Sequence, residues 1–314
     1  MIVETFTSPI ILFFVLGMLA GFARSDLSIP DAMAKAMAIY LMVAIGLKGG
    51  VSIAESGFTR DLILAGLAGI TLSFIIPFPV FTLLSRFGGL GRTDAAATAA
   101  HYGSVSLVTY ITAVEMFDSA GMPSASFMVA VLALMETPAI ISGLSLAKRQ
   151  SSGSRGKLVH EVLLNASVVL LIGAMVIGYI AGPAGYEPIS PAFSGGYRGV
   201  LCLFLLDMGL IASRRLRETR ALTWRLGFLG VAIPVVNGII GVGIGSLLGL
   251  DSGTSAILGV LAASASYIAV PAAMRIALPK ADPGIYLSMS LGITFPFNVI
   301  VNLTLISWLA EWMS

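Results

Sequence analysis

Two segments at equivalent places in the two halves of the chain constrain its fold most. The first runs from Asp94 to Thr112 and the second from Thr254 to Ala272, and each has the length of a membrane span. Small and hydroxyl residues interrupt both segments, Gly103 to Ser106 in the first and Ser264 to Ser266 in the second. Lipid offers no hydrogen-bond partners, so the loosened backbone needs protein, water or a ligand. Paired broken helices therefore predict a binding site near the membrane midplane.

The surrounding sequence belongs to a membrane protein with many spans. Hydrophobic residues make up 57% of the chain and charged residues 11%, whereas charged residues are about a quarter of a soluble domain. We predict an all-α integral membrane protein with ten transmembrane helices. The spans are Ser8 to Ala23, Met33 to Val51, Leu62 to Leu84, Asp94 to Met116, Ser124 to Leu146, Val162 to Ile180, Gly195 to Ala212, Ala221 to Leu250, Gly253 to Ala277 and Gly284 to Trp308.

The ten spans form two matching groups of five. An offset of 160 residues places Ser104 on Ser264 and Ser106 on Ser266, and Glu136-Thr137-Pro138-Ala139 parallels Thr294-Phe295-Pro296-Phe297. Because five is odd, the second group crosses the membrane in the opposite direction, which makes an inverted repeat. We therefore expect a first repeat over residues 1–147, a polar linker over 148–161 and a second repeat over 162–314. The broken fourth and ninth helices are expected to cross at the midplane.

The distribution of basic residues predicts the orientation in the membrane. Of the 18 Lys and Arg residues, only Lys48, Arg60 and Arg198 fall in loops after even-numbered spans, which leaves 15 in the other loops. Basic loops stay in the cytoplasm. We therefore expect a cytoplasmic linker and both termini outside, in a bacterial-type inner or plasma membrane. These residues lie between apolar spans rather than in one patch, so their charge does not indicate a nucleic-acid partner.

Polar groups inside the spans indicate an ion site. Glu136 lies deep in the fifth span, and the matching part of the tenth supplies Thr294 and Asn298. Carboxylates, hydroxyls and loosened backbone carbonyls are the hard oxygen ligands of small cations. We predict a sodium ion held by Glu136 and Asn298, with Thr294 and the Ser104 and Ser264 hydroxyls as further ligands. In the alternative interpretation, Glu136 is hydrogen-bonded between helices.

The two breaks themselves indicate an anion site. Helix N-termini that face one another bring positive dipole ends and free N–H groups toward one point, which suits a small anion. The alternative for these hydroxyl residues is plain helix packing. The candidate substrate-binding residues are Gly103, Ser104, Ser106, Thr109, Ser264, Ala265, Ser266 and Tyr267.

An intramembrane enzyme is the alternative from another class. His101 and Ser104 are three residues apart and could pair as base and nucleophile. However, His160-Glu161 lacks a second histidine at metal-binding spacing, and hydrolysis does not explain an inverted repeat. A passive channel shares the polar midplane and is separated from a transporter by steady unitary currents. We expect a transporter that is no enzyme and needs no cofactor besides a coupling ion.

Four stretches resemble the SbtA-type sodium-dependent bicarbonate transporters. They are AIGLKGG (Ala44 to Gly50), RTDAAATAAHYGSVSLVT (Arg92 to Thr109), METPAI (Met135 to Ile140) and SASYIAVPAAMRIALPKADPGIY (Ser264 to Tyr286). The resemblance implies a homotrimer that takes up bicarbonate with sodium. It also implies a moving core of spans three to five and eight to ten against a gate of spans one, two, six and seven. The implied site residues are Gly103, Ser104, Ser106, Thr109, Glu136, Ser264, Ala265 and Ser266.

The chain departs from the pattern of this family at three places. Tyr267 stands where the family carries an acidic residue, and Leu107-Val108 replaces smaller or hydroxylated neighbours. The linker is short, so docking of a soluble regulator does not follow from the resemblance. A phenol in place of a carboxylate removes a sodium ligand and narrows the site. The alternative function is therefore a sodium- or proton-coupled carrier of another small organic anion.

Overall fold

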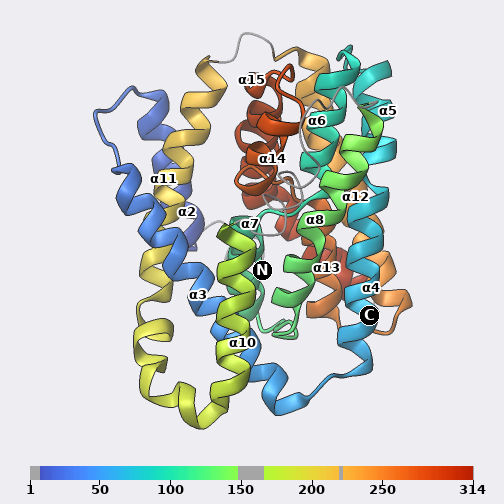
Figure 1. Ribbon diagram of the computed structural model, residues 1–314. Helices are drawn as coiled ribbons and strands as arrows, with labels where there is room; N and C mark the ends of the chain where they lie inside the picture. Colours follow the sequence, from blue (N-terminus) through green and yellow to red (C-terminus); the bar gives the residue numbers. More distant parts are fainter. Residues whose placement is uncertain (1–7, 148–165, 219–221, 314) are drawn as a thin grey trace.

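The computed structural model describes residues 8–147, 166–218 and 222–313, and Figure 1 shows their arrangement. The described residues form helices joined by short loops, with no strand among them. The predicted linker, residues 148–161, lies outside the described residues.

The first half of the chain contributes seven helices to the described fold. They are α2 (Pro9–Phe22), α3 (Asp31–Ser56), α4 (Arg60–Ile75), α5 (Pro77–Arg86), α6 (Arg92–Gly103), α7 (Leu107–Ser119) and α8 (Met128–Leu146). The break between α4 and α5 is slight, because Pro77 begins the second helix directly after Ile76.

The second half begins with α10 (Ala166–Tyr186), which turns at Gly182 (φ 59°), and two short helical turns, η1 (Glu187–Ile189) and η2 (Pro191–Gly195), follow it. Next come α11 (Tyr197–Glu218), α12 (Trp224–Leu247), α13 (Ser252–Ala263) and α14 (Ala269–Ala277). The last segment contains α15 (Pro283–Leu287), α16 (Phe295–Phe297) and α17 (Leu303–Met313), joined by the π-helical stretches η3 (Ser288–Thr294) and η4 (Asn298–Asn302).

Six helical stretches of the described chain are long and apolar enough to cross a membrane. They are Asp31–Ser56, Arg60–Arg86, Met128–Leu146, Val169–Ile189, Trp224–Leu247 and Pro283–Met313. The other four predicted spans correspond to α2, which has 14 residues, to the broken pairs α6/α7 and α13/α14, and to α11. The α11 sequence includes Asp207 and several arginines, which lower its hydropathy.

Matching caps begin two of the long helices. The Thr59 hydroxyl accepts a hydrogen bond from the Leu62 N–H at the start of α4, and Thr223 accepts one from Leu226 at the start of α12. An N-cap hydroxyl satisfies one of the free N–H groups of the first turn. These two helices are the third and eighth predicted spans, so equivalent places in the two halves use the same cap.

The helices separate into two groups (Figure 1). The outer group contains α2, α3, α10 and α11, and the inner group contains the remaining helices. Within the outer group, glycines let backbones touch: a Cβ added at Gly17 of α2 would lie 2.1 Å from the Leu206 carbonyl oxygen of α11. One added at Gly50 of α3 would lie 1.9 Å from the Met175 carbonyl oxygen of α10. Small residues allow such close packing in membranes.

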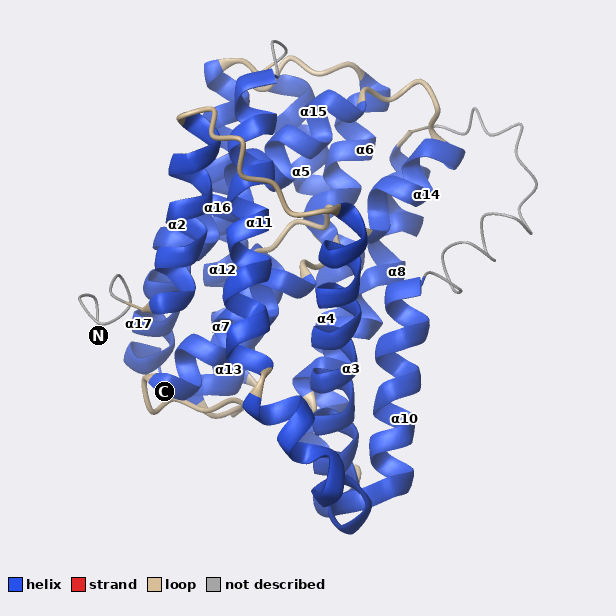
Figure 2. Ribbon diagram, turned by 90° about the vertical axis from the view of Figure 1, so that its left-hand side faces the viewer, coloured by secondary structure: helices blue, strands red, loops and turns tan. Residues whose placement is uncertain are grey.

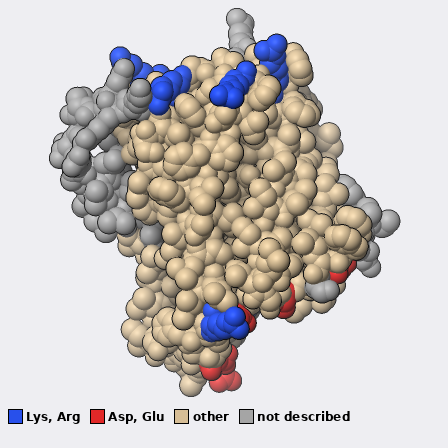
Figure 3. Space-filling model, turned by 90° about the vertical axis from the view of Figure 1, so that its right-hand side faces the viewer, with Lys and Arg blue, Asp and Glu red and all other residues tan. Residues whose placement is uncertain are grey.

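The face drawn in Figure 3 carries its charged side chains at two ends. In Figure 3, basic side chains gather at the upper end of the visible face, and acidic side chains lie at the lower end with one basic cluster. Figure 2 shows that α3 and α10 extend furthest toward the lower end. A wide uncharged band between charged ends is the surface expected of a protein that faces hydrocarbon.

Candidate functional site

Both predicted interruptions are present in the structure. Helix α6 ends at Gly103 and α7 begins at Leu107, with extended backbone at Ser104 (φ −90°, ψ 176°). Helix α13 ends at Ala263, Ser264 is extended (φ −81°, ψ 164°), and α14 begins at Ala269. The small and hydroxyl residues therefore end the helices where the sequence predicts it.

The two breaks lie against each other. The Ser106 N–H donates to the Ser264 hydroxyl oxygen at 3.0 Å, and the Ser266 N–H donates to the His101 carbonyl at 2.8 Å. Each break thus supplies a hydrogen-bond partner for backbone that the other leaves free. Irregular backbone inside a membrane requires hydrogen-bond partners of this kind, because lipid offers none.

Two residues fix the first break locally. The Ser106 hydroxyl caps α7, because its oxygen accepts from the Thr109 N–H at 3.3 Å and from the Thr109 hydroxyl at 3.0 Å. Gly103 lies against the junction of α4 and α5, where an added Cβ would be 2.4 Å from Pro77 Cγ and 2.8 Å from the Ser73 carbonyl oxygen. No side chain fits at Gly103 without displacing that junction.

A small cavity opens between the two breaks and α8. Residues Val105 to Leu107 line it from the first break, Ser266 to Ile268 from the second, and Glu136 from α8. Its volume is about 10 Å³, which is the room of about one water molecule. The structure therefore brings together Ser106, Ser266, Tyr267 and Glu136 in a nearly closed space.

Glu136 is buried, with 6% of its surface exposed, and within the described chain its Oε2 has no hydrogen-bond partner. The helix beside it is opened. Ser73 of α4 donates to the Met135 carbonyl and accepts from the Ala139 N–H at 3.1 Å. Its hydroxyl therefore replaces the helical hydrogen bond that Met135 and Ala139 would otherwise form. Pro138 removes another backbone donor. A buried carboxylate oxygen without a partner needs a proton or a cation to offset its desolvation.

Three further polar atoms near the breaks have no hydrogen-bond partner among the described residues. They are the hydroxyl oxygens of Ser104 and Tyr267 and the Nε2 atom of His101, and all three are buried. The His101 Nδ1–H donates to the Ala97 carbonyl at 2.7 Å, and its ring stacks on Tyr286. Buried polar atoms are rarely left unpaired, so these atoms are available to a ligand.

Two predicted sodium ligands lie in separate networks. The Thr294 hydroxyl donates to the Gly230 carbonyl at 2.7 Å and accepts from the Tyr102 hydroxyl at 2.7 Å. The Asn298 amide donates to the Ala263 carbonyl at 2.9 Å, at the end of α13. Neither side chain lines the cavity that contains Glu136. The structure therefore does not place the predicted pair of Glu136 and Asn298 in one cavity.

Tyr267 connects the second break with the outer group of helices. Its ring packs edge-on against Phe295 with centroids 5.4 Å apart, and Phe295 packs edge-on against Phe14 of α2 at 5.3 Å. Such pairs add about 0.5–1.5 kcal/mol beyond the area they bury. Through Phe295, Tyr267 is thus part of a contact between the two helix groups.

Two contacts of the inner helices have no signal in the sequence. Ser73 is a single hydroxyl residue in an apolar span, and nothing in the sequence distinguishes it. Its role becomes visible only in its contact with α8. Arg198 of α11 forms an ion pair with Glu115 of α7, across the boundary between the helix groups. This pair borders a second cavity of about 380 Å³, which Lys48 and Tyr197 also line. Ion pairs between distant segments leave no signal in a single sequence.

The geometry of the breaks and of the cavity defines a class of protein. Two broken helices that meet at a buried polar cavity inside a helical membrane protein are typical of transporters. Residues 9–311 match the profile of the Na+-dependent bicarbonate transporter superfamily, so the chain belongs to that family. It is therefore a multi-pass membrane transporter and not an enzyme. A search of curated proteins found no match to the chain.

Proposed function

We propose that this protein is a secondary active transporter that imports bicarbonate together with sodium. The family and the site support the proposal jointly. The observation that carries it is the set of buried polar atoms without partners at the meeting point of the two breaks, above all Glu136 Oε2. Burial of a polar atom without a partner costs free energy. A cation and an anion bound together there would supply the missing partners, and their opposite charges would offset one another.

The sodium ion would bind at Glu136. Its carboxylate supplies the negative charge, and Pro138, which has no N–H, leaves the Leu134 carbonyl oxygen of the same helix without its helical donor. These are hard oxygen ligands. Asn298 and Thr294 would then act indirectly, because their side chains already hold the end of α13 and the contact with α12.

The anion would bind where α7 and α14 begin. Both helices start at the breaks, so the positive ends of their dipoles and their first N–H groups favour a small anion. The Ser104 and Tyr267 hydroxyls are free to donate, and Ser106, Thr109, Ser264 and Ser266 complete the polar surroundings. Bicarbonate is larger than one water molecule, so the present cavity is a closed form that must widen to admit it.

The two ions would depend on each other for binding. Sodium at Glu136 offsets the carboxylate charge, which would otherwise repel an anion in the same small cavity. Coupling of this kind is reciprocal: if sodium raises the affinity for bicarbonate, bicarbonate raises the affinity for sodium by the same factor. An inward sodium gradient would therefore drive bicarbonate import.

We also propose the ten-span inverted repeat and the orientation predicted above. Three features support the repeat: the matched breaks, the matched caps of Thr59 and Thr223, and the pairing of α2 with α11 and α3 with α10 across the two halves. The segregated charges in Figure 3 support cytoplasmic loops at the basic end and both termini outside. The resemblance to the bicarbonate transporter family is the sole support for the proposed homotrimer.

A cysteine-labelling experiment tests this orientation. Ser152→Cys in a Cys202→Ala background places one thiol in the 148–161 linker. In intact cells the thiol should stay unlabelled by an impermeant maleimide, and it should react after the cells are permeabilised. Ready labelling in intact cells would reverse the orientation.

A carrier of another small organic anion, coupled to sodium or protons, is the second candidate. The Tyr267 phenol favours it, because it occupies the position of an acidic residue in the family and lines the cavity. Here the unpartnered Glu136 would carry a proton instead of a sodium ion.

Uptake of labelled bicarbonate into proteoliposomes decides between the two. Purified protein is reconstituted, and uptake is measured with an inward sodium gradient, with an inward proton gradient and with neither. We expect stimulation by sodium. Stimulation by protons alone, or competition only from organic acids, would favour the second candidate.

A further inference from the structure

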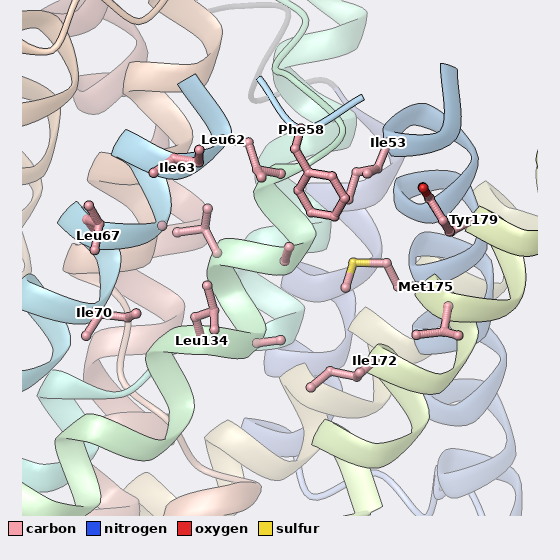
Figure 4. Close-up of a pocket in the computed structure, with 15 residues that line it drawn as sticks. Ile53, Phe58, Leu62, Ile63, Leu67, Ile70, Leu134, Ile172, Met175 and Tyr179 are labelled. Atoms are coloured by element: carbon pink, nitrogen blue, oxygen red, sulfur yellow. The ribbon is translucent and has the colours of Figure 1, made fainter. Parts of the chain in front are cut away.

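An apolar groove separates two closely packed helix pairs on the lipid-facing surface. Figure 4 shows α8 as its floor, with α4 on one side and α10 on the other. Its volume is about 450 Å³, within the range of about 300–1,000 Å³ that is usual for ligand pockets. Phe58, Ile63, Leu67, Leu134, Ile172 and Met175 are among the side chains that line it.

The lining has almost no polar group. Tyr179 carries the one side-chain oxygen among the residues of the groove, and the walls include exposed apolar side chains such as Leu67, with 58% of its surface exposed, and Ile63, with 53%. A water molecule needs two to four polar partners, which this lining does not offer. In a membrane protein the groove must therefore contain hydrocarbon.

The length of the groove matches one leaflet of the bilayer. On α4 it runs from Leu62 to Ile70, about 12 Å at 1.5 Å per residue, and Phe58 extends it outward from the helix start. Half of a hydrocarbon core of about 30 Å is about 15 Å. At the outer end, the rings of Phe58 and Tyr179 lie 6.4 Å apart, and Arg60 begins α4 two residues after Phe58. Aromatic and basic residues of this kind mark the headgroup level.

The groove also lies on the boundary between the two helix groups. Helices α3 and α10 touch through Gly50, and α4 and α8 touch through Gly69, where an added Cβ would be 2.6 Å from Val131 Cγ1. Contacts of α8 with α3 and α10 are sparse by comparison. The groove is therefore a seam between two tight pairs, and a displacement of one pair against the other would change its shape.

We propose that this seam binds one acyl chain of a bilayer phospholipid as a resident lipid, with the headgroup beside Phe58, Tyr179 and Arg60. The chain fills the space between the two pairs in the arrangement described here. This inference rests on the membrane class of the protein and not on the transported ion. The bound chain stabilises the present position of the inner helices against the outer group.

Gly66 offers a way to fill the groove without disturbing the helices. It lines the groove, and a Cβ added there would meet only Leu134 Cδ1, at 3.5 Å. Gly66→Leu therefore places its side chain where the acyl chain would lie, and Gly66→Ala fills less of the space. Gly199→Leu is the matched control, because Gly199 is exposed on α11 and a Cβ there meets nothing within 4 Å.

The probe is phosphatidylcholine that carries a photoactivatable diazirine on one acyl chain. Protein is reconstituted in vesicles with this lipid and irradiated, and cross-linked peptides are quantified. We expect cross-links in the segments 62–70 and 130–134 of the wild-type protein. They should fall about tenfold in Gly66→Leu, which corresponds to about 1.4 kcal/mol of lost binding, and less in Gly66→Ala. Cross-links near the exposed Trp224 should stay constant and serve as the internal standard.

Thermal melting and gel filtration establish that each variant is folded. Unchanged groove cross-links in folded Gly66→Leu would overturn the proposal. So would a wild-type groove without lipid cross-links. A disulfide between two copies of a Leu67→Cys variant in the Cys202→Ala background would then identify a second chain as the cover of the groove. Bicarbonate uptake is measured separately, so a failure here does not bear on the transported ion.

Discussion

The two breaks are related by sequence but differ in how firmly they are held. The first has three non-helical residues, and Ser106 caps the helix that follows. The second has five, and α14 starts without a side-chain cap at Ile268, which has 45% of its surface exposed. The Ser266 hydroxyl accepts only one long bond there, from the Val270 N–H at 3.4 Å.

This difference assigns different roles to the two breaks. The first is fixed by its cap and by the close contact of Gly103 with Pro77, so it forms a rigid wall of the cavity. The second has fewer local bonds and carries Tyr267, so it is the part that we expect to adapt when the cavity widens around an anion. Substitutions in the two breaks should therefore have unequal effects.

The largest effect is expected for Glu136→Gln. The variant keeps the size of the side chain and one oxygen but removes the charge that would offset a bound cation. Sodium-stimulated uptake should fall by more than about tenfold, equivalent to about 1.4 kcal/mol. Sodium titration of uptake measures it. Asp118→Asn, an acid-to-amide change at an exposed position of α7, is the control. A normal sodium dependence in Glu136→Gln would remove this residue from the site.

The ends of α6 and α13 should both lose stability when the size of the last helical residue changes, and α6 should lose more. Gly103→Ala forces a methyl group against Pro77 and Ser73 and should cost about 1–3 kcal/mol. The equivalent change in the second half, Ala263→Gly, removes a methyl group and should cost about 0.5–1 kcal/mol. Thermal melting in detergent compares the two. Equal shifts would mean that the first break is no more rigid than the second.

Removal of the serine hydroxyls should affect the two breaks unequally. Ser106→Ala loses the cap of α7 and should cost about 0.5–2 kcal/mol of stability. Ser266→Ala loses only the long bond to Val270 and should melt close to wild type. Each should lower bicarbonate affinity several-fold if the hydroxyl contacts the anion. Unchanged affinity in both variants would limit the hydroxyls to capping.

The smallest effect on stability is expected for Tyr267→Phe. The phenol oxygen lies near the Ser106 side chain but makes no hydrogen bond of ordinary geometry with the described residues, so its removal should change the melting temperature little. The edge-on contact with Phe295 remains in the variant. The apparent KM for bicarbonate should rise if the hydroxyl donates to the anion. An unchanged KM would show that Tyr267 serves the contact between helix groups and not the substrate.

Much of the helical pattern could be predicted from the sequence, because apolar length and small-residue interruptions are local features. Both breaks fall at the predicted serines, and Glu136 and Tyr267 lie at the predicted cavity. These local features are informative in a membrane protein because every backbone group without a hydrogen-bond partner costs free energy in lipid.

The hydrogen-bond partners could not be predicted in the same way. The sequence suggests a pairing of Asn298 with Glu136 because both are polar residues in matching spans, but the Asn298 amide donates to the Ala263 carbonyl at the end of α13. Ser73 has no unusual neighbour in the sequence, yet its hydroxyl stands between Met135 and Ala139, 62 and 66 residues away. Such contacts depend on which helix faces are turned toward one another, and one sequence does not contain that information.

The bonds between the two breaks also bear on how the protein is made. Ser106 is bonded to Ser264, His101 to Ser266 and Tyr102 to Thr294, so each pair joins the first half to the second. A ribosome delivers the first half to the membrane long before its partners leave the exit tunnel. During that interval polar groups of the first half stay unpaired, and α2 and α3 lack α11 and α10. We therefore expect the first half to be degraded when it is expressed alone, and to be rescued when the second half is synthesised in the same cell.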